Sequence, residues 1–169
     1  MATLRCTKKL LSELKLKPED GSTPLNDLSG WHANLIRVDR RKCILFTHDK
    51  TLFSFLVPGL TKPDFQRTRY VFGQNLFRNL MREALPQSQI ELFLDDIRDI
   101  QFAKTNSRSV LGSMNDLTYL LKFKIADNGG LANRDIMELN YDLNRIPMSA
   151  IEETYSIDEL RKLCGRLNE

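Results

Sequence analysis

The sequence has few of the residues from which disulfide-stapled or metal-dependent proteins are built. Its 169 residues include three cysteines, Cys6, Cys43 and Cys164, and no two of them form a C-x-x-C arrangement. A disulfide framework and a cysteine zinc site are therefore not indicated. The histidines number two, His32 and His48, and no H-E-x-x-H, G-x-S-x-G or P-loop pattern occurs. We expect no metal, no cofactor and no catalytic residues, and a non-enzymatic role is favoured over an enzyme.

Long hydrophobic runs are also missing. No stretch approaches the roughly 18 apolar residues that a membrane span needs, and the opening MATLRCTKKLLSELKLKPEDG lacks the apolar core of a signal peptide. We therefore expect a cytoplasmic protein with no membrane partner. A hydrophobic content of 41% and a charged content of 28% are ordinary for a folded chain. The length fits a single domain, 1–169, with a flexible loop at about 18–30 in KPEDGSTPLNDLSG.

The hydrophobic pattern predicts an α+β fold. A three-stranded meander is expected at 31–57, with strands at about 31–38, 42–48 and 51–57, and further strands are expected at TLRC and IQFAK. From Phe65 the apolar residues recur at helical spacing, and other segments between the strands and after them do the same. The composite is a small antiparallel or mixed sheet of about five strands, packed by about six helices.

Basic residues are concentrated in the first half of the chain. The net charge is only +3, but residues 1–82 hold 15 Lys and Arg against 7 Asp and Glu. The DRRKC turn of the meander places Arg40, Arg41 and Lys42 at a hairpin tip, where they could contact a nucleic-acid backbone. The alternative is that these charges simply solvate a turn.

A second polar segment, FAKTNSRSVLGSMNDL at 102–117, has the composition of an anion-binding loop. Lys104 and Arg108 supply charge, Thr105 and Asn106 supply hydrogen-bond donors, and Ser113 precedes Asp116 in a spacing close to a capping box. A helix that begins at Ser113 would direct its free N–H groups at this loop. The alternative is a strand-to-helix connection whose polar groups are satisfied by its own side chains.

Several of these segments together resemble a family of uncharacterised bacterial proteins. The matching stretches are RCTKKLL, WHANL, DRRKCILFT, KTLFSFLVPG, FAKTNSRSVLGSMNDL and LNRIPM. They are spread over nearly the whole chain, and the family bears a domain-of-unknown-function label. The resemblance implies one unit over 1–169, and it implies no activity, cofactor or catalytic residue.

Three functional hypotheses follow. The leading one is a non-enzymatic binding or regulatory module of the bacterial cytosol that contacts nucleic acid through the hairpin tip and the polar loop. The second is an enzyme acting on a phosphorylated small molecule or nucleotide, with the loop at 104–113 holding the phosphate and His48 or an acidic residue as base. The third is a protein-interaction module, which requires an exposed apolar patch.

Overall fold

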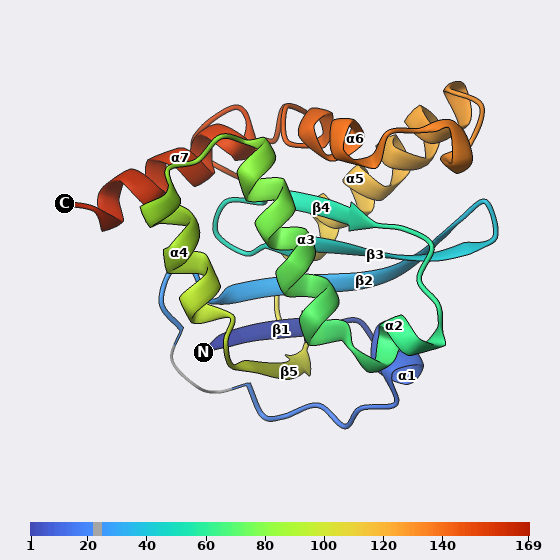
Figure 1. Ribbon diagram of the computed structural model, residues 1–169, viewed down its shortest axis with the longest axis horizontal. Helices are drawn as coiled ribbons and strands as arrows, with labels where there is room; N and C mark the ends of the chain where they lie inside the picture. Colours follow the sequence, from blue (N-terminus) through green and yellow to red (C-terminus); the bar gives the residue numbers. More distant parts are fainter. Residues whose placement is uncertain (22–24) are drawn as a thin grey trace.

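A computed structural model describes residues 1–21 and 25–169 of the chain. These residues form five strands, seven α-helices and one 3-10 helix (Figure 1). The strands are β1 (Ala2–Cys6), β2 (Gly30–Val38), β3 (Arg41–His48), β4 (Ser54–Val57) and β5 (Ile100–Lys104). The helices are α1 (Lys8–Leu14), α2 (Lys62–Gln66), α3 (Thr68–Arg82), α4 (Gln87–Asp96), α5 (Arg108–Asp127), η1 (Leu131–Asn133), α6 (Ile136–Leu143) and α7 (Ser156–Leu167). The predicted α+β class is confirmed.

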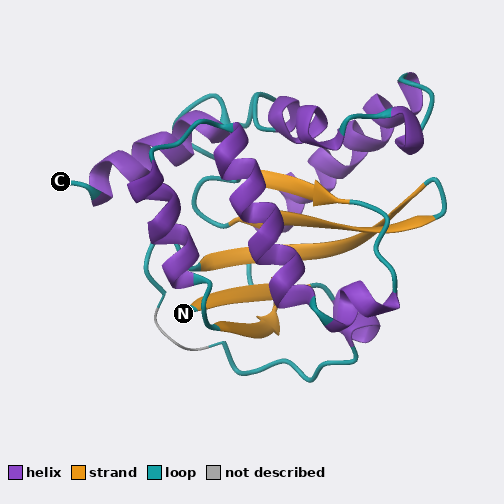
Figure 2. Cartoon of the chain, in the orientation of Figure 1, coloured by secondary structure: helices purple, strands orange, loops and turns teal. Residues whose placement is uncertain are grey.

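The sheet is mixed, with strand order β4-β3-β2-β1-β5. β2, β3 and β4 form the predicted antiparallel meander, whereas β1 runs parallel to both of its neighbours, β2 and β5. Figure 2 shows the five strands as one twisted layer between helices. Within the described residues, no helix is long and apolar enough to cross a membrane.

The front face of the sheet, turned toward the viewer in Figure 1, is covered by α1, α2, α3 and α4, and α7 lies beside α4. Its core is rich in aromatic side chains because the inward residues of three neighbouring strands meet the apolar side of α3. Trp31 lies at the centre, with ring centroids 4.8 Å from His48, 5.2 Å from Phe72, 6.1 Å from Phe55 and 6.4 Å from Phe93. Such tilted and edge-on pairs stabilise a core beyond the area that they bury.

The back face is divided into an apolar and a polar half. Over β3 and β4, apolar side chains pack against α5, η1 and α6. Over β1 and β5 most of the buried residues are polar, and the Gln101 amide donates to the Thr3 hydroxyl at 2.7 Å. The chain after α1 pairs with the free edge of β5, where the Glu19 N–H donates to the Phe102 carbonyl at 2.7 Å, and the Gly21 carbonyl accepts from the Arg5 guanidinium at 3.1 Å.

The free edge of β4 is closed by two asparagine side chains rather than by another strand. The Asn140 amide group accepts from the Leu56 N–H at 2.7 Å and donates to the Leu56 carbonyl at 3.1 Å. One helical turn later, Asn144 does the same for Ser54, at 2.8 Å in both directions. Because a primary amide has the donor and acceptor of a peptide group, α6 satisfies the backbone of the edge strand as a neighbouring strand would.

Some predicted boundaries differ from the structure. The helix that was expected to begin at Ser113 begins at Arg108, because the Ser107 hydroxyl accepts from the Val110 N–H and caps it. The expected helix around Phe65 is divided at Arg67 into α2 and α3, which raises the predicted six helices to seven among the described residues. The predicted flexible loop at about 18–30 includes residues 22–24, which lie outside the described residues, and β2 begins at Gly30.

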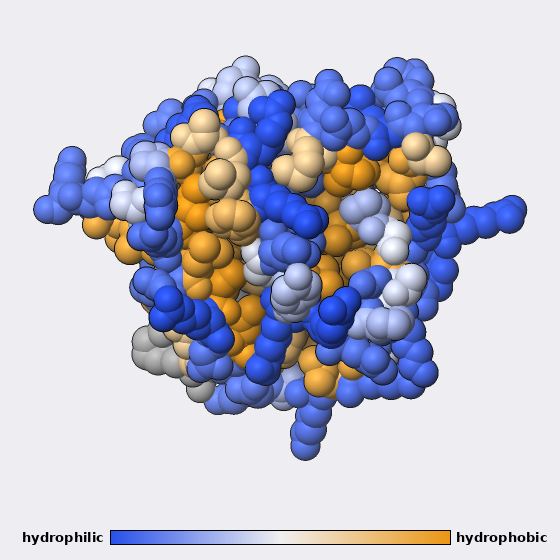
Figure 3. Space-filling view, in the orientation of Figure 1, coloured by the Kyte–Doolittle hydropathy of each residue, from blue (hydrophilic) through white to orange (hydrophobic). Residues whose placement is uncertain are grey.

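An apolar surface is exposed beside α3. Figure 3 shows hydrophobic residues along the groove between α3 and α4. Phe77 is 41% exposed and Met81 56% exposed. A protein-interaction module requires a surface of this kind.

Candidate functional site

The predicted basic hairpin tip is a tight turn that is anchored to the rest of the fold. Asp39 and Arg40 have φ angles of 50° and 66°, and Val38 pairs with Arg41. Positive φ at both central residues is typical of the two-residue turn that matches strand twist. The Asp39 carboxylate accepts from the Leu131 N–H at 2.6 Å, which ties the turn to η1. The basic side chains around the tip are therefore carried by a fixed backbone.

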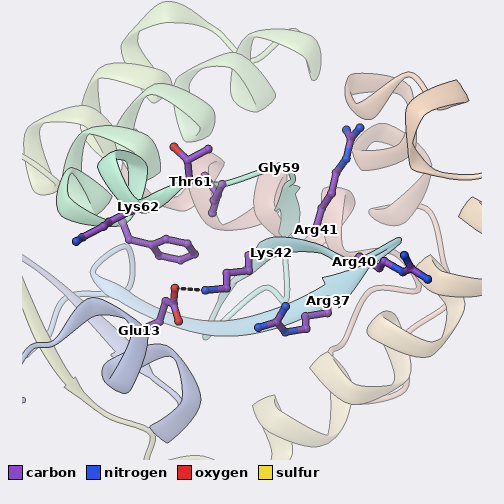
Figure 4. Close-up of a pocket in the computed structure, with 10 residues that line it drawn as sticks. Glu13, Arg37, Arg40, Arg41, Lys42, Gly59, Thr61 and Lys62 are labelled. Atoms are coloured by element: carbon purple, nitrogen blue, oxygen red, sulfur yellow. Dashed lines mark hydrogen bonds and ion pairs between the residues drawn. The ribbon is translucent and has the colours of Figure 1, made fainter.

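Between the hairpin and α2 lies a hollow of about 470 Å³, which we call the basic groove (Figure 4). Its charged lining consists of five basic residues and one acid: Arg37, Arg40, Arg41, Lys42, Lys62 and Glu13. The residues come from three separate segments of the chain, namely the hairpin, α1 and the start of α2. In Figure 4, Arg37, Lys42 and Arg41 leave the hairpin in different directions around the hollow, whereas Arg40 points outward from the tip.

Most of this positive charge has no acidic partner. The Lys42 ammonium lies 2.5 Å from the Glu13 carboxylate and 5.9 Å from the centre of the Phe65 ring. In the described part of the chain, the other four basic residues of the groove make no ion pair within 4.0 Å. Unpaired exposed cations that line one hollow and its border create a positive potential and attract anions.

A second hollow of about 610 Å³ borders the basic groove at Gly59 and Leu60 and runs along α3. It adds Arg67, Arg78 and Tyr70, and the Tyr70 side chain is 56% exposed, with the Arg67 guanidinium 5.5 Å from its ring centre. The acid in this hollow is Asp64, which accepts from both the N–H and the hydroxyl of Thr61 at 2.8 Å. These two hydrogen bonds lower the pKa of Asp64, so its charge is committed to the start of α2.

The polar segment at 104–113 is shorter as a loop than the sequence indicates. Lys104 ends β5 and is exposed, Thr105 and Asn106 lie in the connection to α5, and Arg108 is the first residue of that helix. Ser113 is only 8% exposed inside α5, so the expectation that it caps the helix and faces the loop is wrong. Lys104, Thr105 and Asn106 line a hollow that shares no lining residue with the basic groove. The structure therefore places the predicted binding residues in two locations.

The two histidines lie on opposite faces of the sheet. His32 is fully buried on the back face, with Nδ1 2.6 Å from the Asp49 carboxylate, and its Nε2 accepts from the Asn106 N–H at 3.5 Å. His48 is fully buried on the front face, with Nδ1 2.9 Å from the Thr51 hydroxyl. The expectation that His48 acts as a base beside the 104–113 loop is therefore wrong, because the sheet separates them. The histidine that contacts this loop is His32.

Burial of His48 predicts an acid-sensitive fold. Loss of hydration lowers the pKa of His48 from its ordinary 6.5 to about 4, against smaller opposing effects led by Asp49. Between these values the unfolded chain binds a proton that the folded chain does not, so stability decreases as the pH falls. We expect the free energy of unfolding to drop by about 3 kcal/mol between pH 6.5 and pH 4, measured by urea denaturation.

The control is His48→Gln, which keeps a hydrogen-bonding group near Thr51 and cannot titrate. The difference in pH dependence between this variant and the native chain isolates the contribution of His48. An identical pH dependence in both proteins would show that His48 does not cause it.

Comparison with protein families identifies the family of the chain. A family model described as a domain of unknown function, DUF6933, matches residues 3–159. The chain belongs to the DUF6933 family. This match confirms the resemblance seen in the sequence segments, and in this DUF6933 chain it extends from β1 into α7. None of the curated proteins matches the chain in sequence.

Two groove residues of the DUF6933 chain, Arg37 and Lys62, were not among the predicted binding residues. Arg37 pairs with Lys42 across the β2–β3 ladder. A turn centred on Asp39 and Arg40 predicts this pairing, so the sequence contained a signal for Arg37. Lys62 is brought to the groove by the path from β4 to α2, for which no local pattern exists.

Proposed function

We propose that this DUF6933 chain is a non-enzymatic module that binds nucleic acid along the basic groove and the adjoining α3 hollow. The observation that carries this proposal is the set of four groove cations that have no acidic partner within 4.0 Å among the described residues: Arg37, Arg40, Arg41 and Lys62. A sugar-phosphate backbone provides anions in a row, which suits cations spread over adjoining hollows.

The contacts in this proposal are with phosphates rather than with base edges. Arginine and lysine side chains position a protein on the backbone without reading its sequence. The exposed ring of Tyr70, at the edge of the α3 hollow, offers a surface on which an unpaired base can stack. Single strands are therefore expected to bind at least as well as duplexes.

The experiment is a salt titration of nucleic-acid binding. Purified protein, freed of bound nucleic acid at high salt, is titrated with single-stranded and duplex DNA and RNA by fluorescence anisotropy. Phosphate contacts from four cations give a slope of log K against log salt of roughly −3 for single strands. Between 50 and 200 mM salt the affinity should then fall by roughly two orders of magnitude.

Arg37→Ala combined with Arg41→Ala tests the groove. Both side chains are exposed on regular strand backbone, whereas Arg40 has a positive φ that alanine tolerates poorly. The double variant should shallow the slope by about 1.4 units for single strands. The matched control is Lys50→Ala with Lys122→Ala, which removes the same charge from exposed residues elsewhere. A salt-independent curve, or equal losses in both double variants, would contradict the proposal.

A further inference from the structure

Arg5 carries a buried charge that has no counter-ion among the described residues. Arg5 lies on the central parallel strand β1, between His32 of β2 and Ala103 of β5 in the sheet register. The residue is only 8% exposed. Its guanidinium donates to two backbone carbonyls, that of Gly21 at 3.1 Å and that of Lys104 at 3.4 Å. In the described part of the chain it makes no ion pair within 4.0 Å, and its buried Nε has no hydrogen-bond partner.

Within the described residues, the buried guanidinium of Arg5 therefore lacks both a counter-ion and a full set of hydrogen bonds. Removing a cation from water is unfavourable unless an opposite charge or a full set of hydrogen bonds replaces the water. Two carbonyl groups use two of the five N–H donors of Arg5 and neutralise none of its charge. An anion next to the guanidinium would supply what is missing.

The position of Arg5 in the topology gives such an anion a place to bind. After β1 the chain turns to α1 on the front face, and after β5 it turns to α5 on the back face. The carboxyl ends of these two adjacent parallel strands therefore diverge into a crevice, the location where open sheets of this kind bind ligands. A hollow of about 390 Å³ is present there, and Arg5 is part of its lining.

The other residues of the crevice define the chemistry of the ligand. Lys104 adds an exposed ammonium group, and the side chains of Thr105 and Asn106 add polar groups that make no hydrogen bond to other described residues. Donors from several directions suit the tetrahedral oxygens of a phosphate group. Two exposed acids, Glu19 and Asp20, line the other side. They repel a polyanion, and their carboxylates can accept hydrogen bonds from sugar hydroxyls.

We propose that the crevice between the ends of β1 and β5 binds a small phosphate monoester that carries hydroxyl groups, with Arg5 and Lys104 holding the phosphate. His32 acts as a positioning residue, because its Nε2 accepts from the Asn106 N–H while Asp49 fixes the ring from the other side. This site is separate from the basic groove, and it takes a small molecule rather than a nucleic acid.

The test is calorimetric titration of the full chain with ribose 5-phosphate, inorganic phosphate and acetate. We expect ribose 5-phosphate to bind with a one-to-one ratio, inorganic phosphate to bind more weakly, and acetate not to bind. Lys104→Ala with Thr105→Val changes side chains at the rim and should weaken ribose 5-phosphate binding about tenfold or more. Arg5→Gln should weaken it further, with circular dichroism reporting whether this variant folds.

Two double variants test whether ribose 5-phosphate binds in this crevice rather than in the basic groove or by nonspecific attraction to charge. Glu19→Gln with Asp20→Asn should tighten the binding of inorganic phosphate, because it removes repulsion from the rim. Arg37→Ala with Arg41→Ala should leave ribose 5-phosphate binding unchanged. Absence of binding by both phosphate probes, equal binding of acetate, or loss of binding in the groove variant instead of the Lys104/Thr105 variant would each overturn the proposal.

Discussion

Replacing Asn144 with leucine should lower the free energy of unfolding by about 3 kcal/mol, and replacing Asn140 as well should roughly double the loss. Leucine keeps the branch at Cγ but is larger and has no amide, so it leaves the N–H and the carbonyl of Ser54 buried without partners. Asn144 also accepts from the Ser156 hydroxyl at 2.9 Å, which links the edge strand to the first turn of α7. The loss therefore extends beyond β4 to the packing of the C-terminal helix. Urea denaturation followed by circular dichroism measures the effect.

Asn144→Asp is the matched control, because it keeps the shape and the acceptor while removing the donor. It should be less stable than the native chain, and more strongly so above the pKa of the new carboxyl group. The double leucine variant should also self-associate, because β4 becomes an open edge with unpaired backbone groups. Sizing chromatography reports this directly. A double variant as stable and as monodisperse as the native chain would show that the two amides do not close the edge.

Trp31→Ala is expected to lower the free energy of unfolding by about 4 kcal/mol. Trp31 is fully buried, and it joins β2 to α3 and α4 through its contacts with Phe72 and Phe93. Its indole N–H also donates to the Leu28 carbonyl at 3.2 Å. Alanine removes the ring, the hydrogen bond and the contact between two layers, and the surrounding rings can close the resulting cavity only in part. Because Trp31 is the single tryptophan, unfolding is followed by circular dichroism.

The same substitution has a second expected effect, on His48. The Trp31 ring covers the imidazole with centroids 4.8 Å apart, so its removal lets water approach. The pKa of His48 should then rise toward its ordinary value, and the pH dependence of stability should weaken. Trp31→Phe, which keeps an aromatic ring at this position, should lose much less stability and keep most of the pH dependence. Equal losses in the alanine and phenylalanine variants would contradict the assigned role of the ring.

The elements were predictable where their pattern is local. Short apolar runs, one continuous and one alternating, predicted the meander, and the segment IQFAK predicted β5 to the residue. The predicted start of α5 was wrong because Ser113 and Asp116 have a spacing close to that of a capping box. The apolar positions Val110 and Leu117, both buried in α5, continue the helical spacing before and after Ser113 and were the better signal.

The candidate sites were only partly predictable, because their residues meet through tertiary contacts. The basic hairpin tip is encoded in one turn, and the sequence predicted it. Arg5 was missed because a polar residue between Leu4 and Cys6 on a strand is typical of a solvent-facing position. Its burial depends on a covering segment and on β5, which lies far along the chain. No periodicity within the strand contains that information.

The position of β1 in the sheet has a consequence for the order in which the chain folds. β1 is the first strand of the sheet along the chain, yet one of its two neighbours, β5, follows much later: Arg5 and Lys104 are 99 residues apart. The opposite edge, on β4, is closed by residues still further along the chain, Asn140 and Asn144. The meander of β2, β3 and β4 can form before either border of the sheet closes, because closure needs β5 on one side and α6 on the other. Contacts of such long range slow folding and leave unpaired strands exposed to other chains. Expression at low temperature, or with chaperones in excess, should therefore increase the yield of folded protein.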